Sequence, residues 1–257
     1  MKIGVCGGGI NEWKKITPVG YDYCEGNLSY FASYSEEDFA ETLKQAEKLP
    51  IFVETTNGFF AGDVKLYEVD NAWLKSYCER AFSRAAKLGV KVSVLGSGGA
   101  RRIPDGMGIS QAQKRFAEIL NVCGDVAGEY GIKIAIEPLR YAECNFINTV
   151  SDSMELVLQT NHPCVGTLVD FFHFYSNGEP LSELDGLGDK LFHTHIARPN
   201  PTRGVPRGED TVILQQWAEK LKQIVYRGRM SLECSWAPDY VTAMQNAYEI
   251  MNIFREV

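Results

Sequence analysis

Acidic and imidazole side chains stand where short apolar runs of this sequence stop. In the clearest case the run Ile132–Ile136, apolar except for Lys133, is followed at once by Glu137 and Pro138. An ionised carboxylate at the mouth of a buried segment is costly unless a positive charge compensates it. The residues that terminate the other runs are also mostly acids or histidine, and the whole set is Glu25, Glu54, Ser97, Glu137, Asp170, His195 and Glu233.

Four of these residues form a candidate metal site, with three carboxylates and one imidazole contributed by the last four runs. They are Glu137, Asp170, His195 and Glu233. An oxygen-rich set with one nitrogen suits Mn2+, Mg2+ or Co2+ better than a structural Zn2+ site, which prefers Cys and His. Any one acid alone could equally be a solvated loop residue. Four at consecutive run ends favour the metal interpretation.

Two further histidines lie close to these candidates in the sequence. His173 follows Asp170 by three residues, where it could contact a metal ligand or a substrate oxygen, or be an ordinary buried histidine beside two Phe residues. His193 and His195 point to the same side if they lie on a strand. His195 is nearer the strand end and is the metal candidate, whereas His193 is expected one layer deeper as a hydrogen-bonded structural residue.

Two polar loops offer donors for hydroxyl, carboxylate or phosphate groups. The loop Arg198–Asp210 is rich in Pro and Gly and carries three arginines, one of them Arg203. The turn after the fourth run has free backbone N–H groups and two arginines, which predict an anion-binding site at Ser97, Gly98, Arg101 and Arg102. The alternative for this turn is a tight strand-to-helix connection. It lacks the Lys-Ser/Thr ending of a P-loop.

The elements that position these residues alternate between short apolar runs and amphipathic segments. The expected strands are Lys2–Cys6, Tyr21–Gly26, Ile51–Thr55, Lys91–Leu95, Lys133–Ile136, Val165–Val169, Lys190–Thr194 and Met230–Leu232. The clearest helices are Glu36–Lys48, Asn71–Lys87, Ser110–Glu129, Ser151–Gln159, Thr211–Lys222 and Pro238–Phe254. Eight strand–helix units predict an α/β fold, a single (β/α)8 TIM barrel over residues 1–257. Its active site is expected at the C-terminal ends of the strands.

Composition narrows the partners. The chain has 257 residues, 45% of them hydrophobic, and a formal charge of −7, so it has no net attraction to nucleic acid or anionic lipid. Its seven cysteines are odd in number and unpaired in spacing, as expected of reduced thiols in a cytoplasmic protein. The sequence opens on a strand pattern, without a signal-like segment. We expect a small-molecule partner and no membrane. Large aromatic residues expected in loops would suit a pocket wall or a subunit interface, which leaves a homo-oligomer open, although core packing is their commoner fate; they are Trp13, Phe59, Phe60 and Trp236.

The quoted residues also carry a resemblance to a known family. The segments that match are Glu137-Pro-Leu, Glu143–Thr149, Leu168–His173, His193-Thr-His195, the loop Arg203–Gly208 and Ser231-Leu-Glu233. Together they resemble the xylose-isomerase-like TIM-barrel superfamily of sugar phosphate isomerases and epimerases. The resemblance is closest to D-tagatose and D-psicose 3-epimerases, with hydroxypyruvate isomerases and inosose dehydratases as relatives.

This resemblance implies specific roles. Glu137, Asp170, His195 and Glu233 would bind one divalent ion, typically Mn2+, and Glu137 and Glu233 would also be the catalytic acid–base pair. Glu143, His173 and Arg203 would hold the substrate's oxygens. The implied function is a metal-dependent sugar isomerase or ketose 3-epimerase that abstracts a proton next to a carbonyl through a metal-stabilised enediolate. The substrate would be a sugar or cyclitol.

Three alternatives remain open at this point. An inosose-type dehydratase could use the same metal site, losing a β-hydroxyl after the proton is removed. A metal-dependent phosphodiesterase resembling the apurinic endonucleases needs more histidines than the four present and a surface that attracts DNA. A non-catalytic sugar-binding module on the same barrel would not need both Glu137 and Glu233.

Overall fold

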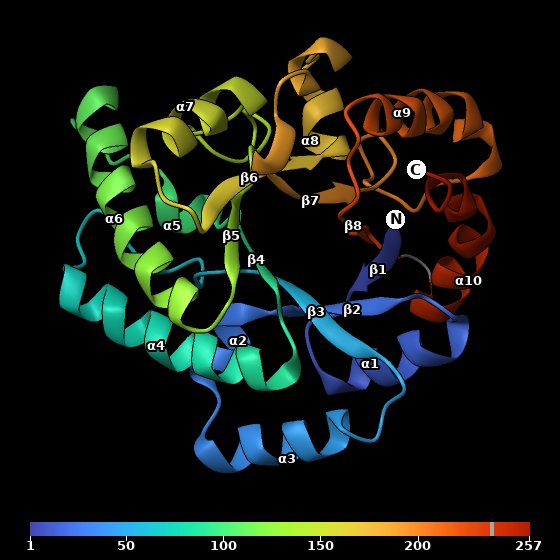
Figure 1. Ribbon diagram of the computed structural model, residues 1–257, viewed down its shortest axis with the longest axis horizontal. Helices are drawn as coiled ribbons and strands as arrows, with labels where there is room; N and C mark the ends of the chain where they lie inside the picture. Colours follow the sequence, from blue (N-terminus) through green and yellow to red (C-terminus); the bar gives the residue numbers. More distant parts are fainter. Residues whose placement is uncertain (237–238) are drawn as a thin grey trace.

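Eight parallel strands form a closed barrel in the computed structural model, which describes residues 1–236 and 239–257 (Figure 1). The strands follow one another around the barrel in chain order, and the first pairs with the last to close it. They are β1 (Lys2–Cys6), β2 (Tyr23–Asn27), β3 (Phe52–Asn57), β4 (Val92–Leu95), β5 (Lys133–Ile136), β6 (Val165–Asp170), β7 (Leu191–Ile196) and β8 (Arg229–Leu232). The predicted TIM barrel is confirmed.

Helices surround the barrel on its outside (Figure 1). They are α1 (Ile10–Ile16), α2 (Leu28–Ser33), α3 (Glu36–Ala46), α4 (Asn71–Leu88), α5 (Gly98–Arg101), α6 (Ile109–Glu129), α7 (Val150–Thr160), α8 (Phe171–Ser176), α9 (Thr211–Gln223) and α10 (Tyr240–Met251). The predicted helix Pro238–Phe254 begins outside the described residues. Its described part is α10 and a 3-10 turn at Asn252–Phe254.

The short helices α2, α5 and α8 were not predicted. They have four to six residues and follow β2, β4 and β6 closely, where the chain turns over the C-terminal end of the barrel. A helix of fewer than two turns shows no readable period, which explains why the pattern missed them. Four strands, β2, β3, β6 and β7, also end later than predicted. As a result Asp170 and His195 lie within strands rather than just after them.

Local capping explains where several helices begin and end. The Ser35 hydroxyl accepts from the backbone N–H of Asp38 at 3.0 Å and starts α3, as predicted. The predicted start of α7 at Ser151 is wrong by one residue: the helix begins at Val150, because Thr149 is its N-cap and forms a capping box with Asp152. Gly89 ends α4 with φ +101°, a left-handed conformation that glycine adopts at no steric cost.

The interior of the barrel changes from apolar to polar along its axis. Five apolar side chains of β4 to β7 form a cluster of their own, composed of Val92, Val94, Ala135, Leu168 and Phe192. Ala135 and Leu168 precede Glu137 and Asp170 by two residues, so each pair shares one face of its strand. The apolar cluster therefore supports a polar layer at the C-terminal ends of the strands.

The two ends of the chain meet beside β1. The Met1 ammonium group donates to the backbone carbonyl of Arg255 at 3.2 Å.

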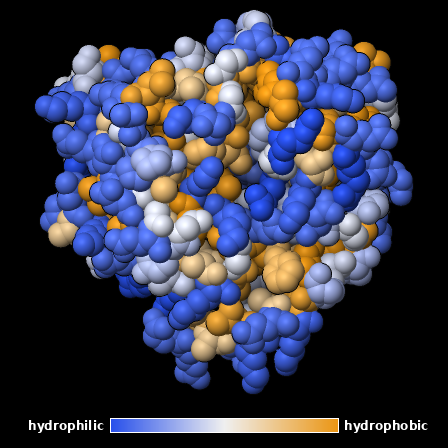
Figure 2. Space-filling model, in the orientation of Figure 1, coloured by the Kyte–Doolittle hydropathy of each residue, from blue (hydrophilic) through white to orange (hydrophobic). Residues whose placement is uncertain are grey.

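The face of the molecule in Figure 2 is mainly hydrophilic, with small hydrophobic patches between polar side chains. Within residues 1–236 and 239–257, every helix is too short or too polar to cross a membrane. All seven cysteines are free thiols, as predicted.

Candidate metal centre and active site

The four predicted metal ligands come together at the C-terminal end of the barrel. Glu137 directly follows β5, Asp170 ends β6, His195 lies in β7 and Glu233 directly follows β8. The register of β6 and β7 sets Asp170 opposite His195. One ligand atom of each residue lies within 4.8 Å of the others, although the first and the last of the four, Glu137 and Glu233, are almost 100 residues apart in the sequence. Such a cluster is small enough for one ion to contact every member.

The donor set fits a divalent cation. Three carboxylates and one imidazole give mostly hard oxygen ligands, which suit Mn2+, Mg2+ or Co2+ and also permit Zn2+. Glu137, Asp170 and His195 are buried, and Glu233 is half-buried, so the site is largely shielded while one side stays accessible. Three negative charges in such an environment repel each other strongly unless a cation lies between them.

His195 lies with its Nδ1 atom toward the cluster. Nδ1 is 3.2 Å from Glu137 Oε1 and 3.2 Å from Glu233 Oε2, whereas Nε2 is 2.8 Å from Glu25 Oε1. Burial alone would lower the pKa of His195, but the charges of Glu25 and Glu233 outweigh it and raise that pKa well above its ordinary value. Without a metal ion, the imidazole is therefore in its protonated, cationic form and supplies part of the missing positive charge.

The two candidate catalytic carboxylates have different electrostatic environments. Burial, and then the charge of Glu233, raises the pKa of Glu137. Burial would also raise the pKa of Glu233, but the charges of Arg203 and His195 hold it below its ordinary value. The proton is therefore held more readily by Glu137 than by Glu233 when no ion is bound.

Arg203 neutralises the open side of the cluster. Its Nη2 atom lies 2.7 Å from Asp170 Oδ2 and 2.5 Å from Glu233 Oε2. The guanidinium also lies over the ring of Phe172, with its central carbon 4.9 Å from the ring centroid. Burial alone would lower the pKa of Arg203, but the charges of Glu233 and Asp170 outweigh it and raise the pKa above its ordinary value. The side chain is therefore always charged.

The two other predicted substrate-binding residues border the cluster. His173 Nε2 is 3.8 Å from Asp170 Oδ2 and 3.9 Å from Glu143 Oε2. Its Nδ1 accepts from the backbone N–H of Arg140 at 3.3 Å, which places the ring proton on Nε2. Arg140 also donates to Glu143 Oε1 at 2.6 Å. His173 therefore links a candidate metal ligand to Glu143 and directs a donor toward both.

The Gly-rich turn after β4 has its polar side chains engaged within the protein. Ser97 bonds the backbone of Phe60, and Arg101 is fully buried and donates to the carbonyls of Leu95 and Ile147. Arg102 is exposed and donates to the carbonyl of Glu143 at 2.8 Å.

The geometry of this turn favours the tight-connection alternative for Ser97 and Arg101. Gly98 packs closely as well, since a Cβ there would lie 2.8 Å from Leu139. Of the side chains at the predicted anion site, Arg102 is exposed, Ser97 is half-buried and Arg101 is buried. Gly96 leaves room for the carboxylate of Glu137, because a Cβ at this position would lie 2.2 Å from Glu137 Oε2.

Three polar residues beside the cluster had no assigned role in the sequence. Glu25 contacts His195, Asn57 Nδ2 donates to Glu233 Oε1 at 2.9 Å, and the Ser231 hydroxyl donates to Glu25 at 2.5 Å. The strand-end pattern flagged Glu25 as a terminating acid, but nothing in the pattern indicated its partner. His193 lies deeper than His195 and bonds Glu25 at 2.8 Å, in agreement with the structural role predicted for it.

The chain is similar to inosose isomerases from two Bacillus species. An inosose isomerase from Bacillus velezensis is 29% identical over 240 residues, which cover 86% of this chain and 81% of that protein. The inosose isomerase of Bacillus subtilis is 33% identical over 144 residues, which are about half of each protein.

Solved structures cover the whole chain. A D-psicose 3-epimerase crystallised in the presence of D-fructose superposes with a TM-score of 0.85 at 20% identity over 100% of this chain and 99% of that one. An IOLI protein with a bound zinc atom has a TM-score of 0.75 at 22% identity, over 100% and 99%. The family described as xylose isomerase-like TIM barrel matches residues 14–256. The chain belongs to this xylose isomerase-like TIM barrel family.

Proposed function

We propose that this protein is a divalent-metal-dependent isomerase or ketose 3-epimerase that acts on a sugar or cyclitol. The convergence of Glu137, Asp170, His195 and Glu233 within 4.8 Å is the observation that carries the proposal. Its relatives add support, since they include inosose isomerases and a probable ketose 3-epimerase. The ion is proposed to be Mn2+, with Mg2+ or Co2+ as alternatives on the same oxygen-rich ligands; the zinc in the related structure keeps Zn2+ in the set to be tried.

In this proposal Glu137 and Glu233 exchange a proton with a carbon next to the substrate carbonyl. Both side chains approach His195 Nδ1 to 3.2 Å, from strands on either side of β7. A divalent ion, when bound, supplies Lewis-acid polarisation of the substrate's carbonyl and neighbouring hydroxyl. Return of the proton to the other face inverts the carbon, and return to the neighbouring carbon moves the carbonyl. An epimerisation needs an acid–base group on each face of the carbon, and the two carboxylates can provide them.

His173, Glu143 and Arg203 are proposed to orient the substrate's oxygens. His173 directs its Nε2 proton into the space between Asp170 and Glu143, so it can donate to a substrate oxygen there. Arg203 borders the same cluster with a charged, planar group that suits paired oxygens. Such contacts hold the reacting carbon against the acid–base pair and contribute to the rate through orientation.

A cyclic ketone of the inosose type is a second candidate substrate. The relatives that match this chain include several inosose isomerases, which favours a cyclitol over an open-chain ketose. The inosose-type dehydratase predicted as an alternative would use the same first step, because it also begins by removing a proton next to a carbonyl. The products separate these reactions.

Deuterium exchange tests the proposal. The metal-supplemented protein would be incubated in deuterated water with free and phosphorylated ketoses, aldoses and inososes, and followed by NMR. We expect deuterium at a carbon next to a carbonyl, together with an inverted centre, a moved carbonyl or a lost hydroxyl. Glu233→Gln should abolish exchange, whereas Glu54→Gln, a matched change of a barrel carboxylate elsewhere, should not. Absence of exchange with every substrate, despite metal binding, would refute the proposed function.

A further inference from the structure

Glu25 is a fully buried carboxylate to which the proposed function gives no role. It lies in β2, across the barrel from His195, and has no exposed surface. Its Oε1 accepts from His195 Nε2 at 2.8 Å. Its Oε2 accepts from His193 Nε2 at 2.8 Å, from Thr55 Oγ1 at 2.7 Å and from Ser231 Oγ at 2.5 Å. Four donors from three other strands therefore converge on one carboxylate, and both of its oxygens accept hydrogen bonds.

These four contacts fix the position of Glu25 independently of any ligand. Thr55 is on β3, Ser231 is on β8 and both histidines are on β7, so the carboxylate is held from several sides of the barrel. The Ser231 hydroxyl is itself bonded to the hydroxyl of Tyr23 at 2.8 Å. A carboxylate held this firmly can impose an orientation on the side chains that bond to it.

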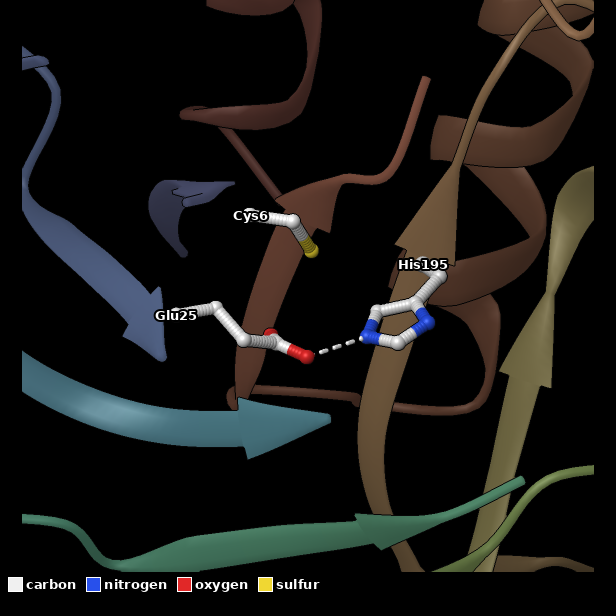
Figure 3. A group of neighbouring side chains, drawn as sticks. All are labelled: Cys6, Glu25 and His195. Atoms are coloured by element: carbon white, nitrogen blue, oxygen red, sulfur yellow. Dashed lines mark hydrogen bonds and ion pairs between the residues drawn. The ribbon is translucent and has the colours of Figure 1, made fainter. Parts of the chain in front are cut away.

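The effect on His195 follows from the chemistry of its two ring nitrogens. An ionised carboxylate only accepts hydrogen bonds, so the nitrogen facing Glu25 must carry a proton. That nitrogen is Nε2 (Figure 3). A neutral imidazole has one N–H, and its other nitrogen, Nδ1, then presents a lone pair. Nδ1 is the atom that lies 3.2 Å from both Glu137 and Glu233.

Cys6 provides the rival explanation for Glu25. Its thiol, the Glu25 carboxylate and His195 Nε2 lie close enough together to hold a metal ion of their own (Figure 3). Both Glu25 oxygens are already engaged, however, and a metal at Nε2 would displace the 2.8 Å bond between His195 and Glu25. Burial, followed by the charge of Glu25, raises the pKa of the Cys6 thiol, which opposes the thiolate that a metal would require.

We propose that Glu25 is a positioning residue that holds His195 as the Nε2–H tautomer and orients its ring, so that Nδ1 is available to a divalent ion at Glu137, Asp170 and Glu233. This inference rests on the metal site of the proposed function. Carboxylates that orient a histidine in this way typically alter metal affinity by about 10–100-fold when they are replaced. Glu25 itself contacts neither the ion nor the substrate.

Calorimetric titration of the metal-stripped full-length protein with Mn2+ and with Zn2+ tests this role. Glu25→Gln keeps the shape of the side chain but removes its charge, and should weaken metal binding about 10–100-fold. Glu25→Asp keeps the charge but withdraws it, and should also weaken binding; it carries the test if Glu25→Gln does not fold. The matched control Glu54→Gln should bind as the wild type does. Wild-type affinity in both folded Glu25 variants would overturn the proposal.

The tautomer itself gives a second readout that does not depend on activity. In Zn2+-loaded protein with 15N-labelled histidine, we expect His195 to show a protonated Nε2 and a metal-bound Nδ1. Metal at Nε2, or loss of binding in Cys6→Ser equal to that in Glu25→Gln, would favour the Cys6 site and contradict the proposed role. If the wild type binds the ion in this way but exchanges no substrate proton, the proposed function fails while the role of Glu25 stands.

Discussion

The two ends of the barrel interior both contain carboxylates, but they balance the negative charge differently. Near the N-terminal end, Glu54 is paired with two cations, since Lys2 Nζ is 2.5 Å and Arg229 Nε is 2.6 Å from its oxygens. At the C-terminal end four carboxylates, Glu25, Glu137, Asp170 and Glu233, share one arginine and the ring of His195. Cations exceed acids in the first group, and acids exceed cations in the second.

This difference separates a group that stabilises the fold from one that is prepared for a ligand. A buried acid with its own cations is satisfied within the protein and needs no further partner. An excess of buried carboxylates raises the energy of the folded chain unless a cation enters. TIM barrels build their active sites at the C-terminal ends of the strands, which is the end where this excess lies. We therefore interpret the charge imbalance as the physical basis of the proposed metal binding.

The largest effect should come from Glu233→Gln, which removes one carboxylate of the acid–base pair and one candidate ligand. We expect kcat to fall by about 10³-fold or more, because general acid–base catalysis alone contributes about 10²–10⁴-fold. Circular dichroism should show an unchanged fold. Near-normal turnover in this variant would contradict the assignment of Glu233 as both ligand and base.

Gly96→Ala should produce the next largest effect on activity without removing a charge. The added Cβ would lie 2.2 Å from Glu137 Oε2, so Glu137 must move away from its present position. A displacement of about 1 Å at a catalytic group can cost about 10²-fold in rate. Steady-state kinetics and metal titration would be measured together. A variant with wild-type kcat would show that the position of Glu137 is not critical.

Metal binding at the C-terminal ends of the barrel strands should stabilise the folded protein. At a free metal concentration 100 times the Kd, the expected gain in the free energy of unfolding is about 2.7 kcal/mol. Thermal unfolding with and without a chelator measures it. The gain should survive in Glu54→Gln and shrink in Glu233→Gln. Equal gains in all three proteins would indicate that metal binds elsewhere.

The smallest expected effect on function, and a clear one on stability, comes from Glu54→Gln at the opposite end. Kinetics should be unchanged, while the free energy of unfolding falls by about 1–3 kcal/mol, toward the lower value because Lys2 is exposed and screened.

The pH dependence of this stability difference follows from the charge of Glu54. Burial would raise the pKa of Glu54, but hydrogen bonds from Lys2 and Arg229 lower it. A lowered pKa in the folded state stabilises the protein fully above the unfolded value of about 4.5, and this contribution is lost as the pH falls below that value and through the lower folded-state pKa. Denaturant unfolding at pH 7 and pH 3 should therefore show the wild type and the variant converging at low pH. A constant difference would show that the charge of Glu54 is irrelevant.

The sequence was informative about the site because the strand pattern is local and periodic. Each of Glu137, Asp170, His195 and Glu233 follows a recognisable apolar run, and barrel geometry then brings the run ends together. The end of α4 was also predicted to within one residue, at Lys87 instead of Leu88, because the helix stops locally at Gly89 in a left-handed conformation.

Long-range contacts could not be read from the sequence in the same way. Glu25 and His195 are 170 positions apart, and no spacing rule pairs them. The role of Gly96 depends on the distance to a side chain of the neighbouring strand, which only the folded barrel defines. The start of α7 is a local feature, and the pattern placed it one residue late. The helix begins at Val150, because Thr149 is its N-cap and Asp152 completes the capping box.

Metal stoichiometry tests the central claim most directly. Metal-stripped wild type, Glu54→Gln and Glu233→Gln would be dialysed against Mn2+, and the ions bound per chain would be counted by elemental analysis. The charge imbalance predicts one tightly bound ion per chain in the wild type and in Glu54→Gln, and much weaker occupancy in Glu233→Gln. A wild-type protein that retains no divalent ion, or a Glu233→Gln variant that retains it fully, would contradict the claim that the carboxylates at the C-terminal ends of the strands form the metal site.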